Sequence, residues 1–366
     1  MQPYQKWIFS GLLTASASCF AAQPSSQNMN DSKSPPVGQI TPPAGPRTDT
    51  GARFLVTADF IYWQAEEDNL LYDEYSANSS SGETQTTVKK PAKLDFEYAP
   101  GFKVGAGALF DHDNWDIFAN YTWLKQEHAK GRVSYPNLGS DLRTGNPFGH
   151  GGASSLTLTT THAHWTCHFN NIDLELGRQF FISRDLVLRP HFGLKGSWMA
   201  QEFNILQVTD YPDGVGGGTL LPFVQTSQTR HNQDFWGIGL RAGLNTAWHF
   251  THDWSIYGDI AASELACRFN DRKKVADTFT TTDFQNITLL NKSFSIVRPV
   301  LEIALGVRYE TFFSRDRYQF FVQAGWEQQI WWDQNQFLNQ NAQYIDTGSG
   351  GALTLQGLDV KLGFAF

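Results

Sequence analysis

The chain ends, at residues 358–366, with the alternating stretch Leu358-Asp359-Val360-Lys361-Leu362-Gly363-Phe364-Ala365-Phe366. Every even-numbered position is apolar, whereas the odd-numbered positions carry Asp, Lys, Gly or Ala. Successive side chains of a β-strand point to opposite faces, so this alternation predicts a strand with one apolar and one polar face. The terminal Phe366 belongs to the apolar face.

The same period of two recurs along the chain after about residue 53. Apolar residues occupy nearly every second position over 54–62, 115–123, 186–198, 236–248 and 297–309. Strands of soluble domains usually have about five or six residues, whereas a tilted strand needs about 9–11 to cross a hydrocarbon layer. Aromatic residues stand at the ends of these stripes, as Trp236 and Trp248 do. Long strands with aromatic ends predict a transmembrane barrel.

Four short segments with a His or Arg before Asp interrupt the pattern, with the Asp at positions 113, 185, 253 and 316. They predict four tight turns, and hence five hairpins. The intervening stretches, near 66–92, 126–161, 204–232, 268–292 and 333–350, are predicted as long loops on the opposite side. We therefore expect an all-β, antiparallel, up-and-down transmembrane barrel over residues 52–366. The best count is ten strands, rising to 14–16 if the loops contain more.

The first residues are predicted to be an export signal. Lys6 precedes an apolar stretch that ends at Phe20, and small residues follow, which is typical of a signal peptide over residues 1–21. A lipoprotein signal with Cys19 is the alternative. Residues 22–51 are rich in Pro, Ser, Asn and Gln and predict a disordered periplasmic leader.

The composition excludes two classes of function. The chain has 28 Phe, 12 Tyr and 12 Trp, only 17% charged residues and a net charge of −8, so it lacks the basic footprint of a nucleic-acid binder. No run of eighteen apolar residues exists outside the first segment, which argues against helical membrane spans. In a barrel, many of the aromatic residues would instead coat the lipid-facing surface.

The polar face of the strands carries charges of both signs in nearly equal number. Rings of charged side chains set ion preference in pores, so we expect a mildly selective pore that needs no cofactor or metal. The predicted pore-lining residues are Asp59, Lys103, Asp116, Arg189, His191, Lys195, Arg241, Asp259, Arg298, Glu302, Arg308, Glu310, Glu327, Asp359 and Lys361.

Several strand phrases resemble one family. The stretches 54–64, 101–110 and 171–181 are similar to the Legionella major outer membrane protein family, which includes MOMP-like proteins of chlamydia-related bacteria. The resemblance implies a pore-forming outer-membrane protein that lets small hydrophilic solutes diffuse passively, and it implies no active site. The alternative is a surface structural or adhesion protein whose loops meet a host surface.

The terminal strand also resembles the assembly signal of bacterial outer-membrane barrels. On this interpretation the barrel assembly machinery recognises Phe364 and Phe366, and outer-membrane lipid covers the apolar face. The pattern carries no signal for the oligomeric state.

The two cysteines after the export signal, Cys167 and Cys267, leave a disulfide, a cross-link to a neighbour and free thiols as alternatives. Alternation places His162, His164 and His168 on the strand face opposite Cys167. We interpret the three histidines as polar rim residues rather than zinc ligands, because a zinc site needs closed geometry.

A rim protease is the third alternative for the function. Omptin-like proteases place Asp and His at the outer rim of a ten-stranded barrel, and candidates here are Asp210, His231, Asp234, Glu264 and Asp333. Acid–base catalysis requires these groups to converge. We favour hydrated carboxylates and expect no enzyme activity.

Overall fold

The computed structural model describes residues 52–81, 84–110, 114–135, 142–145, 152–153, 158–211, 223–280, 285–341, 344–347 and 350–366. The predicted signal peptide at 1–21 and the predicted leader at 22–51 lie outside the described residues. All described residues belong to one compact unit, residues 38–366. None of them forms a helix long and apolar enough to cross a membrane.

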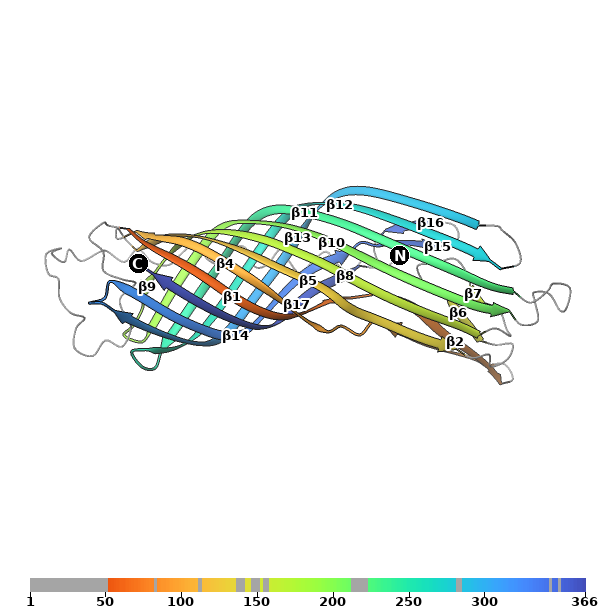
Figure 1. Ribbon diagram of the computed structural model, residues 1–366, viewed down its shortest axis with the longest axis horizontal. Helices are drawn as coiled ribbons and strands as arrows, with labels where there is room; N and C mark the ends of the chain where they lie inside the picture. The colour runs from red at the N-terminus through yellow and green to blue at the C-terminus, as the bar shows by residue number, and fades with distance from the viewer. Residues whose placement is uncertain are drawn as a thin grey trace. The chain divides into compact units, whose positions relative to one another are not determined.

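Ten strands of the described residues form one closed antiparallel barrel, which confirms the predicted fold and strand number (Figure 1). The first strand pairs with both its chain neighbour and the last strand, which closes the sheet. Around the barrel the strands are β1 (Ala52–Glu67), β4 (Tyr98–Phe110), β5 (Trp115–Tyr135), β8 (Leu158–Arg178), β10 (Leu186–Tyr211), β11 (Phe223–His249), β12 (Trp254–Phe279), β13 (Gln285–Phe313), β14 (Tyr318–Asn335) and β17 (Gly351–Ala365).

Shorter strands come mostly from the long connections at one end of the barrel. A small sheet contains β2 (Leu71–Ser81), β3 (Thr84–Lys93), β6 (Leu142–Gly145) and β7 (Gly152–Ala153). A separate hairpin pairs β15 (Leu338–Asn341) with β16 (Tyr344–Thr347). The two-residue β9 (Phe180–Phe181) pairs with β10 at the other end.

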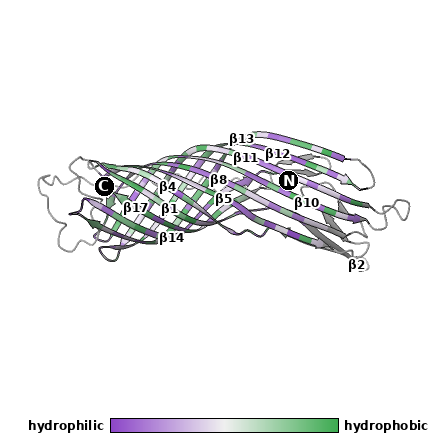
Figure 2. Ribbon diagram, in the orientation of Figure 1, coloured by the Kyte–Doolittle hydropathy of each residue, from purple (hydrophilic) through white to green (hydrophobic). Residues whose placement is uncertain are grey.

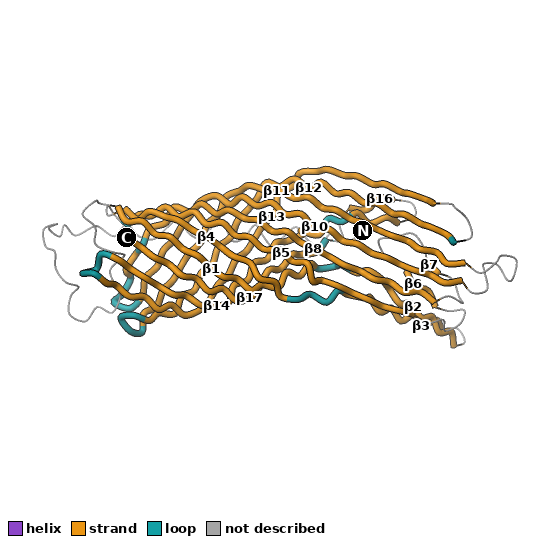
Figure 3. Tube along the Cα trace, viewed as in Figure 1, coloured by secondary structure: helices purple, strands orange, loops and turns teal. Residues whose placement is uncertain are grey.

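Three of the four predicted turns lie together at the end of the barrel that carries the C-terminus, and the ends of β4 and β5 that flank the fourth lie there too (Figure 3). The turn between β13 and β14 has three successive residues with positive φ, at Ser314, Arg315 and Asp316. The tip of the β4–β5 turn, residues 111–113, lies outside the described residues. The short-turn end and the long-connection end are thus opposite, as the spacing of the four Asp residues predicted.

The predicted loops, in contrast, are wrong in extent. β10 continues to Tyr211 and β11 begins at Phe223, so most of 204–232 is strand; likewise β12 and β13 occupy most of 268–292. The loop prediction followed polar composition, but the backbone ladder and the inward alternation of Phe203 and Ile205 continue there. A strand whose outward face is polar satisfies its backbone groups as well as an apolar one does. The wall therefore extends well beyond the apolar belt.

The outward face of the barrel carries a belt of exposed apolar side chains. Polar and apolar residues alternate along the strands (Figure 2). On β11, Ile238 and Leu240 are exposed between the aromatic residues Trp236 and Trp248, while polar residues begin at Asp234. β11 has 27 residues, against the roughly 9–11 that a tilted strand needs to cross hydrocarbon.

The register of the strands sets the width of the barrel. Following paired residues from Phe60 around the barrel in both directions reaches β12 at Arg268 and at Ile256, twelve residues apart. Ten strands with this stagger imply a tilt of about 40° and a backbone radius of about 10 Å. Large side chains from opposite walls of so narrow a barrel can meet at its centre.

Candidate functional site in the barrel interior

The interior near the turn end is charged and contains a cavity of about 340 Å³. Strands from the whole circumference contribute to its lining. Inward and lipid-facing positions alternate along each strand, and the charged residues occupy the inward positions. Their side chains therefore converge inside the barrel. This cavity is the first of two zones inside the barrel.

Lys195 of β10 is the centre of one part of this charged zone. Its Nζ lies 2.7 Å from Asp173 Oδ1 and 2.5 Å from Glu302 Oε1, and the side chain is fully buried. Arg241 also contacts Glu302 and lies 3.2 Å from Glu175 Oε1. These pairs connect β8, β10, β11 and β13 across the lumen.

Arg189 extends the network toward the turns. Its Nη2 is 2.5 Å from Asp116 Oδ1 and its Nη1 is 3.0 Å from Glu175 Oε2. Nearer the rim, Glu310 accepts from Gln319 Nε2 at 3.0 Å and lies 3.0 Å from His249 Nε2. Hydrogen-bonded ion pairs of this kind hold their side chains in place at the cost of desolvating them.

A second set of pairs involves the first and last strands. Lys103 Nζ contacts Glu327 and lies 2.8 Å from Asp359 Oδ2, while Lys361 Nζ is 3.3 Å from Asp59 Oδ2. Lys103 also lies 4.7 Å from the centroid of the Trp63 ring, where the charged zone ends.

All fifteen predicted pore-lining residues point into the barrel. Eleven line the cavity, whereas four do not: Asp59, Lys195, Arg298 and Asp359. Three of these four are buried in the ion pairs just described, and Arg298 lies farther from the turns and pairs with Asp333 at 3.3 Å. Their role in lining a conducting pore stays a prediction. The structure adds Asp173 and Glu175, which share the inward parity, to the cavity wall.

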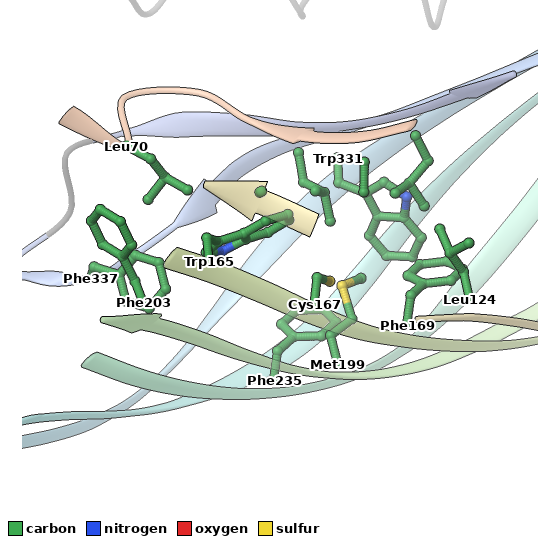
Figure 4. Close-up of a cluster of buried hydrophobic side chains, with 14 of the residues drawn as sticks. Leu70, Leu124, Trp165, Cys167, Phe169, Met199, Phe203, Phe235, Trp331 and Phe337 are labelled. Carbon is green, nitrogen blue, oxygen red and sulfur yellow. The ribbon is translucent and has the colours of Figure 1, made fainter. Parts of the chain in front are cut away.

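The second zone, farther from the turns, is apolar. Five aromatic side chains point inward and are buried: Trp63, Phe169, Phe235, Phe269 and Trp331. Figure 4 shows three of them, Phe169, Phe235 and Trp331. The ring centroids of Phe169 and Trp331 are 5.5 Å apart, and those of Phe235 and Phe269 are 5.0 Å apart. None of these five residues lines the charged cavity. Aromatic side chains therefore fill the lumen at this level.

This zone corrects the expectation of a polar inward face along the whole strand. We expected many of the aromatic residues to coat the lipid-facing surface, but some of them lie inside the barrel. A signal was present in the sequence, because Ile61-Tyr62-Trp63 and Trp331-Trp332 are apolar on both faces, as strands buried on both sides are.

Two connecting segments add to the apolar zone. After β14 the chain turns inward, and Gln336 N donates to Gln233 Oε1 of the opposite wall at 2.8 Å. Gln233 Nε2 donates in return to Gln334 O at 2.8 Å. The ring of the next residue, Phe337, lies 5.9 Å from that of Phe203 and is buried. This segment crosses the barrel interior.

The connection from β1 to β4 contributes in the same way. Leu70 and Tyr72 are buried, and the Phe96 ring packs edge-on against Trp165 at 5.7 Å. Gln201 Nε2 donates to Glu67 Oε2 at 2.9 Å. Burial raises the pKa of Glu67 well above its usual range, although the Gln201 amide opposes this. The inward side chains of the wall and the two connecting segments therefore pack the lumen together at this level.

Cys167 and Cys267 both point into the apolar zone as free, buried thiols. No disulfide joins them, and the alternative of a cross-link to a neighbour stays a prediction. The barrel wall separates both thiols from neighbouring molecules, because each side chain lies on the inward face.

The residues of the rim-protease alternative do not converge. His231 points inward against Phe337, whereas Asp210, Asp234 and Glu264 have the outward parity of their strands. Burial lowers the pKa of His231 well below its ordinary value, and Lys273 adds to this.

The three histidines of β8 lie outward, opposite Cys167, as alternation predicted. Among the described residues, no three metal-ligating side chains come together.

The residues of the predicted assembly signal lie on the outward face at the turn end. The Phe366 ring lies 6.1 Å from Phe54 and 5.9 Å from Phe364. Phe54 N donates to Phe366 O at 2.8 Å, so the last residue still pairs with the first strand. Recognition by assembly machinery stays a prediction.

A closed barrel with an apolar outward belt, aromatic residues at both edges of the belt and charges inside defines a transmembrane β-barrel protein. Residues 47–366 match the family model of the Legionella pneumophila major outer membrane protein precursor. The chain therefore belongs to this family and is an outer-membrane protein.

Several solved barrels are similar at low identity. The Escherichia coli outer membrane protease OmpT is 9% identical, with 88% of this chain and 99% of that chain covered and a TM-score of 0.37. A Pseudomonas aeruginosa FadL homologue is 7% identical, with coverages of 87% and 90% and a TM-score of 0.25. The Pseudomonas putida toluene transporter TodX is 8% identical, with coverages of 87% and 90% and a TM-score of 0.20. A comparison with curated proteins finds no similar sequence.

Proposed function

We propose that this outer-membrane barrel is a pore-forming protein that lets small hydrophilic solutes and ions diffuse, and that its apolar zone is the gate. The observation that carries the proposal is the charged cavity of about 340 Å³ at the turn end. It requires no cofactor and no catalysis. The solutes are recognised only by size and charge.

The contrast between the two zones supports this function. Burying ion pairs is costly, and apolar residues of similar volume often give equal or greater stability. The apolar zone shows that this chain fills its lumen with Phe and Trp where the interior is sealed. A barrel that served only as a scaffold would gain by continuing that packing to the turn end. The charges there are suited to contact with water and ions.

The apolar zone supplies the gate. Hydrophobic constrictions in channels close by expelling water, and they open when their side chains move apart. Trp331 stands at the centre of the constriction, because its ring meets Phe169 at 5.5 Å and Phe235 at 6.3 Å. Lys195 of the charged zone lies 5.7 Å from the same ring.

Planar-bilayer recording of the refolded protein tests the proposal. We expect small or rare unitary steps from the wild type, and larger or more frequent steps from Trp331→Ala. Trp326→Ala is the matched control, because Trp326 is on the same strand but faces outward in the belt. Its conductance should equal that of the wild type.

Absence of unitary steps from both the wild type and Trp331→Ala, at every voltage, would reject the pore. The barrel would then serve as a surface structural or adhesion protein. The extension of β10 to β13 beyond the apolar belt favours this as the second function, since it raises the long connections above the membrane.

A further inference from the structure

The outward wall of the extension carries a row of basic side chains. Paired residues on five successive strands are Lys130, His164, Asn204, Arg230 and Lys274. We call the four basic members, Lys130, His164, Arg230 and Lys274, the basic stripe. Its residues are on the solvent-facing side, because their neighbours in sequence are the inward, buried ones. A net charge of −8 makes such a local excess of positive charge unusual for this chain.

The stripe is electrostatically strained. Arg230 and Lys274 are directly opposite each other on β11 and β12, and like charges in that arrangement destabilise a sheet. In the described part of the chain, Arg230, Lys274 and Lys130 form no ion pair. An anion bound between the strands would remove this repulsion.

A hollow of about 440 Å³ lies along one end of the stripe. Lys130 and His164 line it, together with Arg132 and His162 of the adjacent register row. Asn204 adds an amide to the same wall. Arginine, lysine and amide groups around a shallow hollow are suited to phosphate and carboxylate oxygens.

Asp95, whose backbone pairs with that of Lys130, forms no ion pair with it among the described residues, and three other acidic residues near the stripe are already engaged. Asp234 pairs with Arg272 at 2.6 Å, and Glu127 pairs with Lys125 at 2.6 Å. Glu202 Oε1 accepts from Asn204 Nδ2 at 2.8 Å. The cations of the stripe therefore lack a protein counterion among the described residues.

The position of the stripe indicates its ligand. Arg230 is six residues beyond Trp236 of the aromatic belt, which is about 20 Å along the strand and about 15 Å along the membrane normal at the tilt given above. The stripe faces sideways along the wall, so molecules embedded beside the barrel reach it. At that height the outer leaflet presents the phosphorylated and carboxylated sugars of its glycolipid.

We propose that the basic stripe binds the anionic sugar core of outer-leaflet glycolipid, with phosphate or carboxylate oxygens between Arg230 and Lys274 and a sugar in the hollow beside Lys130. Bound glycolipid would brace β5, β8, β10, β11 and β12 where they extend above the membrane. The proposal rests on the location and the wall of the barrel, and it is independent of conduction through the lumen.

Binding of fluorescently labelled lipopolysaccharide with a phosphorylated core to the full-length protein in detergent tests the proposal. Arg230→Gln/Lys274→Gln should bind about tenfold or more weakly, since two charged hydrogen-bond donors are lost. Arg184→Gln/Arg317→Gln removes the same charge from exposed positions at the turn end and should stay within about twofold of the wild type. Lipopolysaccharide stripped of phosphate should bind the wild type about as weakly as intact lipopolysaccharide binds the stripe variant.

The thermal stability of the same proteins gives a second readout. Without lipopolysaccharide, the stripe variant should be at least as stable as the wild type, because the Arg230–Lys274 repulsion is gone. Added lipopolysaccharide should raise the melting temperature of the wild type only. If the double variant does not refold, Lys274→Gln alone should show the same loss of binding in part.

Equal lipopolysaccharide affinity of the stripe variant and the wild type would overturn the proposal. So would an equal melting-temperature increase produced by inorganic phosphate alone, because the stripe would then be a site for a free anion rather than for glycolipid.

Discussion

Asp271 on β12 is a single side chain whose ionisation the barrel controls. It points inward in the extension, beyond the apolar belt, and it is buried without a hydrogen-bond partner among the described residues. Burial raises its pKa to about 8; Lys292 opposes the shift and Asp234 adds to it. The acid is thus neutral in the folded barrel at pH values where it would be charged in the unfolded chain.

This shift predicts a pH-dependent stability. The folded pKa is above the unfolded value of 3.8, so the folded state binds more protons and stability falls as the pH rises from about 4 to about 8. Asp271→Asn should leave stability unchanged near pH 4 and raise the free energy of unfolding by about 2 kcal/mol or more at pH 9. Urea unfolding in lipid vesicles at the two pH values measures this. Asp210→Asn, on the exposed outward face, is the control and should show no such difference between the two pH values.

Among the strands, small residues make room for the inward charges. Gly239 of β11 pairs with Lys195, and Gly193 of β10 pairs with Arg241. A Cβ on Gly239 would lie 1.9 Å from the Glu264 carbonyl oxygen of the adjacent strand. The close approach of β11 and β12 therefore requires glycine at this position.

Gly239→Ala should destabilise the barrel by about 1–3 kcal/mol, because the added methyl group meets backbone rather than a movable side chain. Gly258→Ala on β12 is the control, since its Cβ would meet only Thr246 Oγ1 at 3.3 Å and Leu305 Cδ1 at 3.7 Å. Urea unfolding of both variants measures the difference. Equal stability of the two variants would contradict the packing argument.

For each strand, the sequence predicted best which residues point inward and which point outward. The inward position of Lys195, Arg241 and Glu302 follows from alternation alone, and the structure places all three in one network. The ends of the strands were predicted poorly. Around Phe203 the composition turned polar while the hydrogen-bonded ladder continued, because pairing with a neighbouring strand is a tertiary property.

For the whole molecule, the lumen determines selectivity. Six Arg and Lys side chains and seven Asp and Glu side chains line the cavity, so with its histidines neutral an open pore should prefer cations weakly, by roughly a few-fold in permeability at most. Arg308→Gln should strengthen the preference. Glu310 keeps Gln319 and His249 as partners in this variant, so folding should be retained. Zero-current potentials in a KCl gradient measure the change, and a shift toward anions would contradict the assignment of the cavity as the conduction path.

The alternating sequence by itself determined the barrel class and the side of each strand that meets lipid, and it gave ten as the best strand count, because these follow from a period of two and from the spacing of turns. Only the tertiary structure decided what fills the lumen. Trp63, Phe169 and Trp331 are far apart in sequence and share the inward parity with Asp59 and Lys103. Whether an inward residue faces water or another aromatic ring depends on the stagger and the radius of about 10 Å, which bring opposite walls into contact.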